Sequence, residues 1–282
     1  MLCTKARKNR IKRMKFFSKK TTGEANTFWD HLEVLRWALL RVLAVLVLLV
    51  TVLFANRDFL FDDIIFPPLG SDFIVYRLFC RMGEWLNMPG LCPGDFSIQL
   101  INIQLSGQFM AHISTAFTIA LVLSVPYLLY ECWRFVAPAL YPAERRNVGL
   151  VFFISSFLFY LGVVVSYFLV FPLTIRFLGT YNVSALVPNQ ISIQSYLDTL
   201  YILIFSMGIM FEMPVLAYFL SRMGIVTRQM LQSVRRYAFV AILVLAAIIT
   251  PTTDPFTMLV VAMPLYLLYE VSILVCRKKK NE

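Results

Sequence analysis

The sequence contains few of the residues from which enzymes build catalytic sites. It has only 2 histidines among 282 residues, and charged side chains make up 15% of the chain. It lacks the GxxxxGKS/T, GxGxxG, HExxH and GxSxG patterns that hold nucleotides or form hydrolase sites. Two histidines also leave little material for a metal site. We therefore expect no cofactor, no metal and no catalytic centre.

Long apolar runs are the dominant feature of the chain. Hydrophobic residues make up 59% of it, and the mean hydropathy is +0.73, whereas soluble domains are about 45–50% apolar. A bilayer core of about 30 Å needs about 20 helical residues. Six apolar segments stand out, at 38–54, 109–130, 148–171, 199–220, 237–250 and 256–276. The sequence therefore predicts an all-α polytopic membrane protein with six transmembrane helices.

The last two segments differ from the others. The fifth has only 14 residues, and Pro264 and Glu270 interrupt the sixth. We interpret them as a short helical hairpin that spans a thinned bilayer or enters it without crossing. Both alternatives return the chain to the same side of the membrane.

Basic residues are distributed unevenly between the two predicted sides. The net charge is +10, and 22 of the 26 lysines and arginines lie on one side, in residues 1–41, 134–146, 222–236 and 277–280. The positive-inside rule then places both termini in the cytoplasm. We expect a disordered basic extension at 1–27, one membrane domain at 28–276 and a basic tail at 277–282. The first apolar run is expected to be an uncleaved anchor.

The outer loop, residues 55–108, is the largest stretch outside the predicted membrane segments. Residues 77–86 have the pattern of a short amphipathic helix at the interface. Cys80 and Cys92 both lie in this loop, where an oxidising compartment would favour a disulfide. The alternative is two unpaired thiols. We expect the remaining cysteines to be free, namely Cys3, Cys132 and Cys276.

Glu212 lies inside the fourth apolar run and precedes Pro214 by two residues. A carboxylate at bilayer depth costs roughly 2.5–3.5 kcal/mol on insertion scales, so it needs a partner or water. One interpretation is a structural hydrogen bond to a neighbouring helix. The other is an intramembrane polar site for a binding partner. Pro214 is expected to bend or loosen the helix beside it.

Three further prolines fall in or at the end of the apolar segments: Pro126, Pro172 and Pro264. Bent helices would suit a cupped, concave assembly. Prolines are also simply commoner in membrane helices than in soluble ones, and the sequence leaves both explanations open. Pro172 is expected to end the third segment.

Several local motifs point beyond a generic membrane protein. The chain contains WDHLEVLRWALLR at 29–41, WRFVAPALYPAERR at 133–146, FEMPVL at 211–216, RRYAFV at 235–240, TPTTDPF at 250–256 and MPLYLLYE at 263–270. Together these resemble the TatC family, the multi-spanning core subunit of the twin-arginine (Sec-independent) protein translocase. The resemblance extends from about residue 28 to about residue 275, and the motif at 133–146 is its most specific part.

The resemblance implies a receptor in a bacterial inner membrane. Members of the family bind twin-arginine signal peptides of folded cargo on the cytoplasmic face. They form oligomers and work with single-span partners of the TatA and TatB type, and transport is driven by the proton-motive force. No nucleic-acid partner is implied. The alternative is an ion- or proton-coupled secondary transporter, but such folds usually contain two related halves, and we find no internal repeat.

Carboxylates suit the recognition of two guanidinium groups, because each can accept a bidentate pair of hydrogen bonds. The resemblance assigns signal-peptide binding to Glu144, with Phe135 and Pro138 shaping the loop that carries it. The alternative for Glu144 is an exposed ion pair with the neighbouring arginines, which contributes at most about 1 kcal/mol.

Glu33 is a second candidate ligand, although the motif around it departs from the family pattern. The family often has HLEELR, and its second acid is the one credited with arginine recognition; here that position is Val34. Either Glu33 substitutes for the missing acid, or the site relies on Glu144 and backbone carbonyls. The other interpretation of Glu33 is a first-turn acid that is favourable to the helix dipole. Leu35 and Arg36 match the rest of the motif.

The remaining site predictions concern partner contacts. In the family, a glutamate at the position of Glu212 lies on the concave face, where it offers a hydrogen bond to a single-span subunit or to the signal sequence. Asp254 lies between the fifth and sixth segments. We expect it to be a turn residue, with contact to a partner helix as the alternative.

Overall fold

The computed structural model describes residues 28–70, 73–85, 98–136, 148–182, 184, 189–250 and 254–276. The chain divides into two units, residues 1–41 and residues 42–282, and each is treated by itself. The first unit is represented by the start of helix α2 (Phe28–Ala55), which continues into the second. This helix contains no proline or glycine, so nothing in its backbone interrupts the hydrogen-bond ladder.

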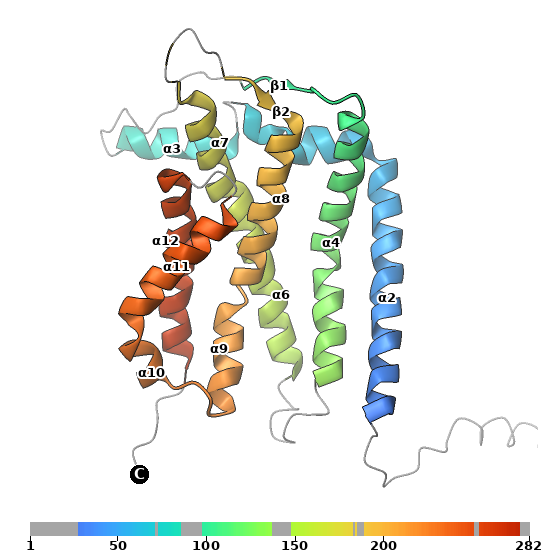
Figure 1. The fold of residues 1–282 in the computed structure, drawn as a ribbon, viewed down its shortest axis with the longest axis vertical. Coiled ribbons are helices and arrows are strands. Elements are labelled where there is room, and N and C mark those ends of the chain that lie inside the picture. The colour runs from blue at the N-terminus through green and yellow to red at the C-terminus, as the bar shows by residue number, and fades with distance from the viewer. Residues whose placement is uncertain are drawn as a thin grey trace, which may run out of the picture. The chain divides into compact units, whose positions relative to one another are not determined.

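Long apolar helices make up most of residues 42–282 (Figure 1). After α2 they are α4 (Gly107–Val136), α6 (Val148–Val165) continuing through the π-helix η5 (Ser166–Val170) into α7 (Phe171–Thr180), α8 (Ile193–Met210), α9 (Met213–Arg222), α10 (Arg228–Ser233), α11 (Arg235–Ile249) and α12 (Pro255–Val275). In the part of the chain that is described, five helical stretches are long and apolar enough to cross a membrane. The prediction of an all-α polytopic membrane protein is confirmed.

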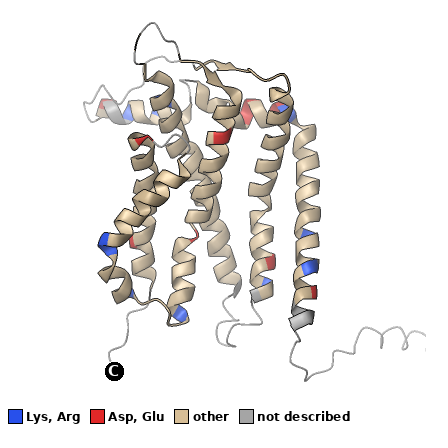
Figure 2. Cartoon of the chain, in the orientation of Figure 1, with Lys and Arg blue, Asp and Glu red and all other residues tan. Residues whose placement is uncertain are grey.

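Charged residues are sparse along the middle of these helices and occur mainly toward their two ends (Figure 2). This distribution is expected when helix centres lie in hydrocarbon and helix ends lie in the headgroup region. The outward faces remain apolar, with Val47, Phe157 and Ile248 among the exposed side chains. Exposed residues of this kind fit a lipid environment.

Two details of the sequence interpretation are corrected. Of the last two helices only α11 is short, with 15 residues, whereas α12 continues for 21 residues through Pro264. Pro264 is buried, and membrane helices tolerate a proline when surrounding groups satisfy the freed carbonyl. Pro172 does not end the third helix, because it occupies the first turn of α7, where its missing N–H is not needed.

The outer loop folds into short elements across one end of the long helices (Figure 1). These are η1 (Phe59–Ile65), η2 (Pro67–Leu69), α3 (Ile74–Trp85) and strand β1 (Leu100–Ile101). Helix α3 confirms the helix expected at 77–86. Strand β1 pairs in parallel with β2 (Ile191–Ser192), with Leu100 opposite Ile191. This pairing connects the loop before α4 to the loop before α8.

Three tyrosine hydroxyls attach this loop to the helices. Tyr167 donates to the Ile64 carbonyl and Tyr196 to the Ile65 carbonyl, both at 2.6 Å. Tyr76 donates to the Pro172 carbonyl at 3.0 Å. Burial raises the pKa of Tyr76 to about 12, with a smaller lowering from the Arg176 charge, so its hydroxyl stays a neutral donor near neutral pH. Buried carbonyls in a turn need such donors.

Candidate functional site

The fourth membrane helix is interrupted beside Glu212. Helix α8 ends at Met210 and α9 begins at Met213, with Pro214 in its first turn. Proline has no N–H to give to the carbonyl four residues earlier, which a helix tolerates in its first turn. At the junction the Glu212 N–H bonds to the Ile209 carbonyl oxygen at 3.1 Å. The break places a carboxylate and loosened backbone within a candidate span.

One oxygen of the Glu212 carboxyl group is already used inside the protein. Ser155 on α6 donates its hydroxyl to Glu212 Oε2 at 2.5 Å. The other oxygen, Oε1, is buried and has no hydrogen-bond partner among the described residues. A buried carboxyl oxygen without a donor is unfavourable by about 1–3 kcal/mol or more. Glu212 therefore makes the structural bond to a neighbouring helix and keeps one acceptor for a further donor.

Close packing of α6 against α8 positions this pair. A Cβ added at Gly162 would lie 2.7 Å from the Met207 carbonyl oxygen, and one at Gly208 would lie 2.7 Å from the Phe159 ring. The two glycines therefore let the helices approach more closely than any larger residue would permit. Ser156, next to Ser155, also has a buried hydroxyl without a partner in the described chain.

A second buried carboxylate, Glu131, was missed by the sequence interpretation. It lies on α4, is 4% exposed and accepts a hydrogen bond from Tyr127 at 3.1 Å. The predicted second apolar segment ends at residue 130, one position before Glu131, and no motif drew attention to this acid. The signal that could have revealed it is the tyrosine four residues earlier, on the same helical face.

Of the residues assigned to signal-peptide binding, the structure describes only some. Phe135 is partly buried in the last turn of α4. Glu144 and Pro138 lie outside the described residues. In the first unit, Glu33 and Arg36 are exposed on α2 and Leu35 is partly buried. The structure fixes no arrangement of these residues relative to Phe135, so the composition of this site remains a prediction.

Asp254 and the cysteines were also singled out from the sequence. Asp254 is the N-cap of α12, and its Oδ1 accepts from the Thr257 N–H at 2.7 Å, which is the local role expected of a turn residue. Cys132 and Cys276 are free thiols, as predicted. Cys80 is disulfide-bonded, while Cys92 and Cys3 lie outside the described residues, so the pairing of Cys80 with Cys92 stays a prediction.

The chemistry available at these positions is hydrogen bonding at membrane depth. Among the described residues, no group of three or more His, Cys, Asp or Glu side chains could hold a metal ion. The Glu212 carboxyl group, the Ser155 hydroxyl and the broken backbone form an acceptor-rich spot between apolar helices. Such a group of atoms offers hydrogen-bond acceptors at membrane depth.

The fold and this spot define a multi-pass α-helical membrane protein with an intramembrane carboxylate. Residues 30–264 match the model of the family described as Sec-independent protein translocase protein (TatC). The chain belongs to this TatC family.

Individual relatives agree over most of the chain. The TatC protein of Blattabacterium sp. subsp. Periplaneta americana is 36% identical over 248 residues, which cover 87% of this chain and 93% of that protein. The TatC protein of Deinococcus radiodurans is 34% identical over 250 residues, which cover 88% of this chain and 85% of that protein. The similarity is therefore not confined to one motif.

Two solved structures also match the fold of this chain. A crystal structure of the twin-arginine translocase receptor TatC in DDM superposes with a TM-score of 0.69 at 29% identity and covers 88% of this chain and 99% of that chain. A second crystal structure of this receptor gives a TM-score of 0.64 at 28% identity. Nothing in these comparisons supports the alternative of a secondary transporter.

Proposed function

We propose that this protein is the receptor and core subunit of a twin-arginine translocation system. It binds twin-arginine signal peptides of folded proteins and assembles with single-span partners of the TatA and TatB type for export driven by the proton-motive force. The observation that carries the proposal is Glu212 Oε1, which is buried in a candidate span of a TatC-family chain and has no hydrogen-bond partner among the described residues. This unsatisfied oxygen supports a role for Glu212 in binding another membrane-inserted segment.

The proposed setting is a bacterial inner membrane with both termini in the cytoplasm. The support is the distribution of basic residues, since 22 of 26 lysines and arginines fall in segments that this orientation places inside. The end of the bundle that carries η1, α3 and the β1–β2 pair then faces outward. The disulfide at Cys80 fits an oxidising outer compartment.

Signal-peptide recognition is assigned to the opposite, cytoplasmic end. Glu144 would accept the paired guanidinium groups, Glu33 would compensate for the missing acid at Val34, and Leu35, Arg36, Phe135 and Pro138 would shape the surface. Paired arginines bind carboxylates through two parallel hydrogen bonds. In a region this basic, an acid is needed to overcome repulsion of the ligand.

Photo-crosslinking in native membranes tests this assignment. A photoreactive residue at position 144, 33 or 34 should crosslink to a radiolabelled twin-arginine signal peptide, and a peptide with both arginines changed to lysine should crosslink much less. Glu144→Lys should abolish both crosslinking and export. Full export by this charge-reversed variant would contradict the proposed docking site.

The partner role of Glu212 is tested separately. Glu212→Ala should leave the protein inserted and stable but weaken its co-purification with single-span subunits and reduce export. Glu84→Ala is the matched control, because Glu84 is an exposed acid on α3, outside the candidate spans. Normal assembly and export by Glu212→Ala would leave the carboxylate with only its structural bond to Ser155.

A further inference from the structure

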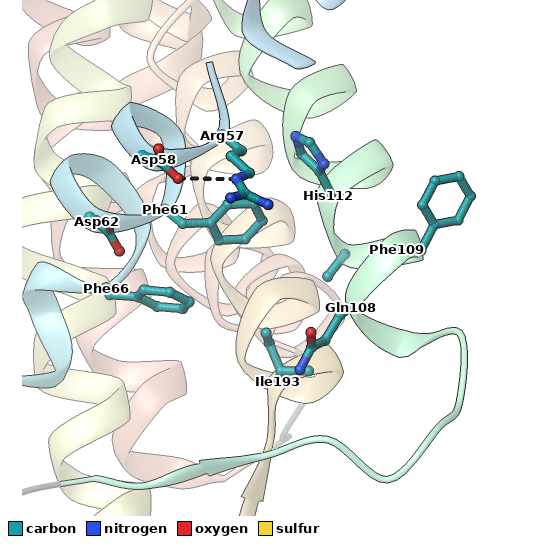
Figure 3. Close-up of a pocket in the computed structure, with 10 residues that line it drawn as sticks. Arg57, Asp58, Phe61, Asp62, Phe66, Gln108, Phe109, His112 and Ile193 are labelled. Carbon is teal, nitrogen blue, oxygen red and sulfur yellow. Dashed lines mark hydrogen bonds and ion pairs between the residues drawn. The ribbon is translucent and has the colours of Figure 1, made fainter. Parts of the chain in front are cut away.

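A second polar site lies away from Glu212, at the end of the bundle that carries η1. A cavity of about 470 Å³ opens there between the end of α2, η1 and the first turns of α4 and α8 (Figure 3). Arg57, Asp58 and Asp62 come from the segment around η1, and Gln108, Phe109 and His112 come from α4. Because these elements begin or end candidate spans, the cavity lies at the depth of the membrane–water interface.

The cavity contains charges of both signs. Arg57 Nε pairs with Asp58 Oδ1 at 3.2 Å, and both side chains are largely exposed. Asp62 contributes a second exposed carboxylate to the same lining. One guanidinium and two carboxylates give the site a formal charge of −1, so an anionic ligand is disfavoured and a ligand with a cationic group is favoured.

The His112 ring forms one wall of the cavity. Its ring stacks on Phe54 with centroids 4.1 Å apart and meets the edge of Phe61 at 5.9 Å. These contacts fix the ring orientation. Nε2 is buried and has no hydrogen-bond partner among the described residues. The imidazole therefore forms part of the cavity wall through its ring, and the charged contacts to a ligand come from Asp62 and Arg57.

The rim of the cavity continues into an apolar stripe. Phe109 lines the cavity and is 58% exposed, and its ring points away from the other labelled side chains in Figure 3. Ile113 and Phe117 follow it on α4 and are also exposed. Their four-residue spacing puts all three on one helical face. That face lies in a candidate span, where hydrocarbon chains cover it.

From this arrangement we infer that the cavity binds the headgroup of a zwitterionic phospholipid with a primary ammonium group, whose acyl chain follows Phe109, Ile113 and Phe117. The ammonium group lies against the exposed Asp62 carboxylate, and the phosphate lies toward Arg57. A trimethylammonium headgroup fits less well, because it has no N–H to donate. A lysine from a protein segment has the same ammonium, but the apolar stripe at the rim favours a lipid.

Native mass spectrometry of the full-length detergent-purified protein tests this inference. The protein is titrated with phosphatidylethanolamine, phosphatidylcholine and phosphatidylglycerol of identical acyl chains. We expect phosphatidylethanolamine to be retained most strongly. Asp62→Asn should weaken its retention by about tenfold, the effect of losing one charge-assisted hydrogen bond. Asp62 is exposed, so the variant should fold normally.

Asp63→Asn is the matched control, since Asp63 is the adjacent exposed acid on η1 and does not line the cavity. It should retain phosphatidylethanolamine as the unchanged protein does. Equal retention of the three lipids, or equal losses in the two variants, would overturn the inference. A lysine-containing peptide that displaces the bound phosphatidylethanolamine would also overturn it, in favour of a protein segment as the occupant.

Discussion

Two membrane helices of this protein each carry a proline and a glutamate a few residues apart, with different results. In α4, Pro126 lies inside an unbroken helix, and Glu131 is bonded to Tyr127 of the same helix. At the α8–α9 junction, Pro214 coincides with a break, and Glu212 is bonded to Ser155 of another helix. The order of proline and glutamate decides which carboxylate lies beside freed backbone carbonyls, because a proline frees carbonyls that precede it in the chain. Glu212 precedes its proline, whereas Glu131 follows its own.

The two carboxylates also differ in their burial and in their hydrogen-bond partners. Glu131 is almost fully enclosed, at 4% exposure. Glu212 is only partly buried and retains one oxygen without a donor in the described chain. A buried polar group that is satisfied specifies structure, whereas an unsatisfied one is a candidate for function. This contrast separates a structural acid from the proposed partner site.

The largest effect is expected where α6 meets α8 beside Glu212. Gly162→Leu should lower the free energy of unfolding by about 2–3 kcal/mol, because its side chain would overlap the Met207 carbonyl and the Phe211 ring. The measurement is an unfolding titration in mixed micelles with sodium dodecyl sulfate. Gly149→Leu is the control, since a Cβ there meets nothing within 4 Å. Equal losses in both would show that the close approach does not matter.

The two prolines should respond differently to replacement by alanine. Pro126→Ala restores an N–H inside α4 and should raise the free energy of unfolding by about 1–2 kcal/mol. Pro214→Ala adds an N–H in the first turn of α9, where none is required, so the change should stay within about 0.5 kcal/mol. The same titration measures both. A larger gain at position 214 than at 126 would refute the account of the helix break.

The hydroxyl that bonds to Glu212 should contribute measurably to stability. Ser155→Ala should cost about 1 kcal/mol, since Oε2 then loses its donor while remaining in an apolar site. Ser156→Ala provides the comparison, because its hydroxyl is buried without a partner in the described chain, and its removal should be neutral or slightly stabilising. If Ser156→Ala is the more damaging variant, the assigned bond is wrong.

The smallest effect is expected at the other carboxylate. Tyr127→Phe removes the hydroxyl that bonds to Glu131 Oε1 within α4, and the loss should be about 0.5 kcal/mol, typical of a pair four residues apart on one helix. Export activity should not change. A defect in export comparable to that of Glu212→Ala would mean that Glu131 also belongs to the functional site.

Much of the fold could be predicted because the relevant signals are local. All six apolar segments correspond to helices, and residues 77–85 of the predicted amphipathic helix fall in α3. The errors came from prolines. Pro172 and Pro264 were expected to end or interrupt helices that in fact continue, since whether a proline is tolerated depends on the groups packed around it.

The site was predictable only in part. The position of Glu212 in an apolar run marked it as unusual, and the motifs around residues 133–146 pointed to the family. The burial of Glu131, the stacking of His112 and the parallel β1–β2 pair were not foreseen. Each depends on residues far apart in the chain or on where a helix ends, and apolar periodicity contains neither kind of information.

The sequence by itself determined that this chain forms membrane-spanning helices and, through its motifs, which family it belongs to. Hydropathy and helix length act within one segment, so they need no knowledge of its neighbours. Only the tertiary structure decided that Glu212 bonds to Ser155 through one oxygen while the other has no partner in the described chain, and that His112 lines a charged cavity. The physical reason is that a side chain's partner is set by which helix packs against it, and here the glycines at 162 and 208 allow that packing.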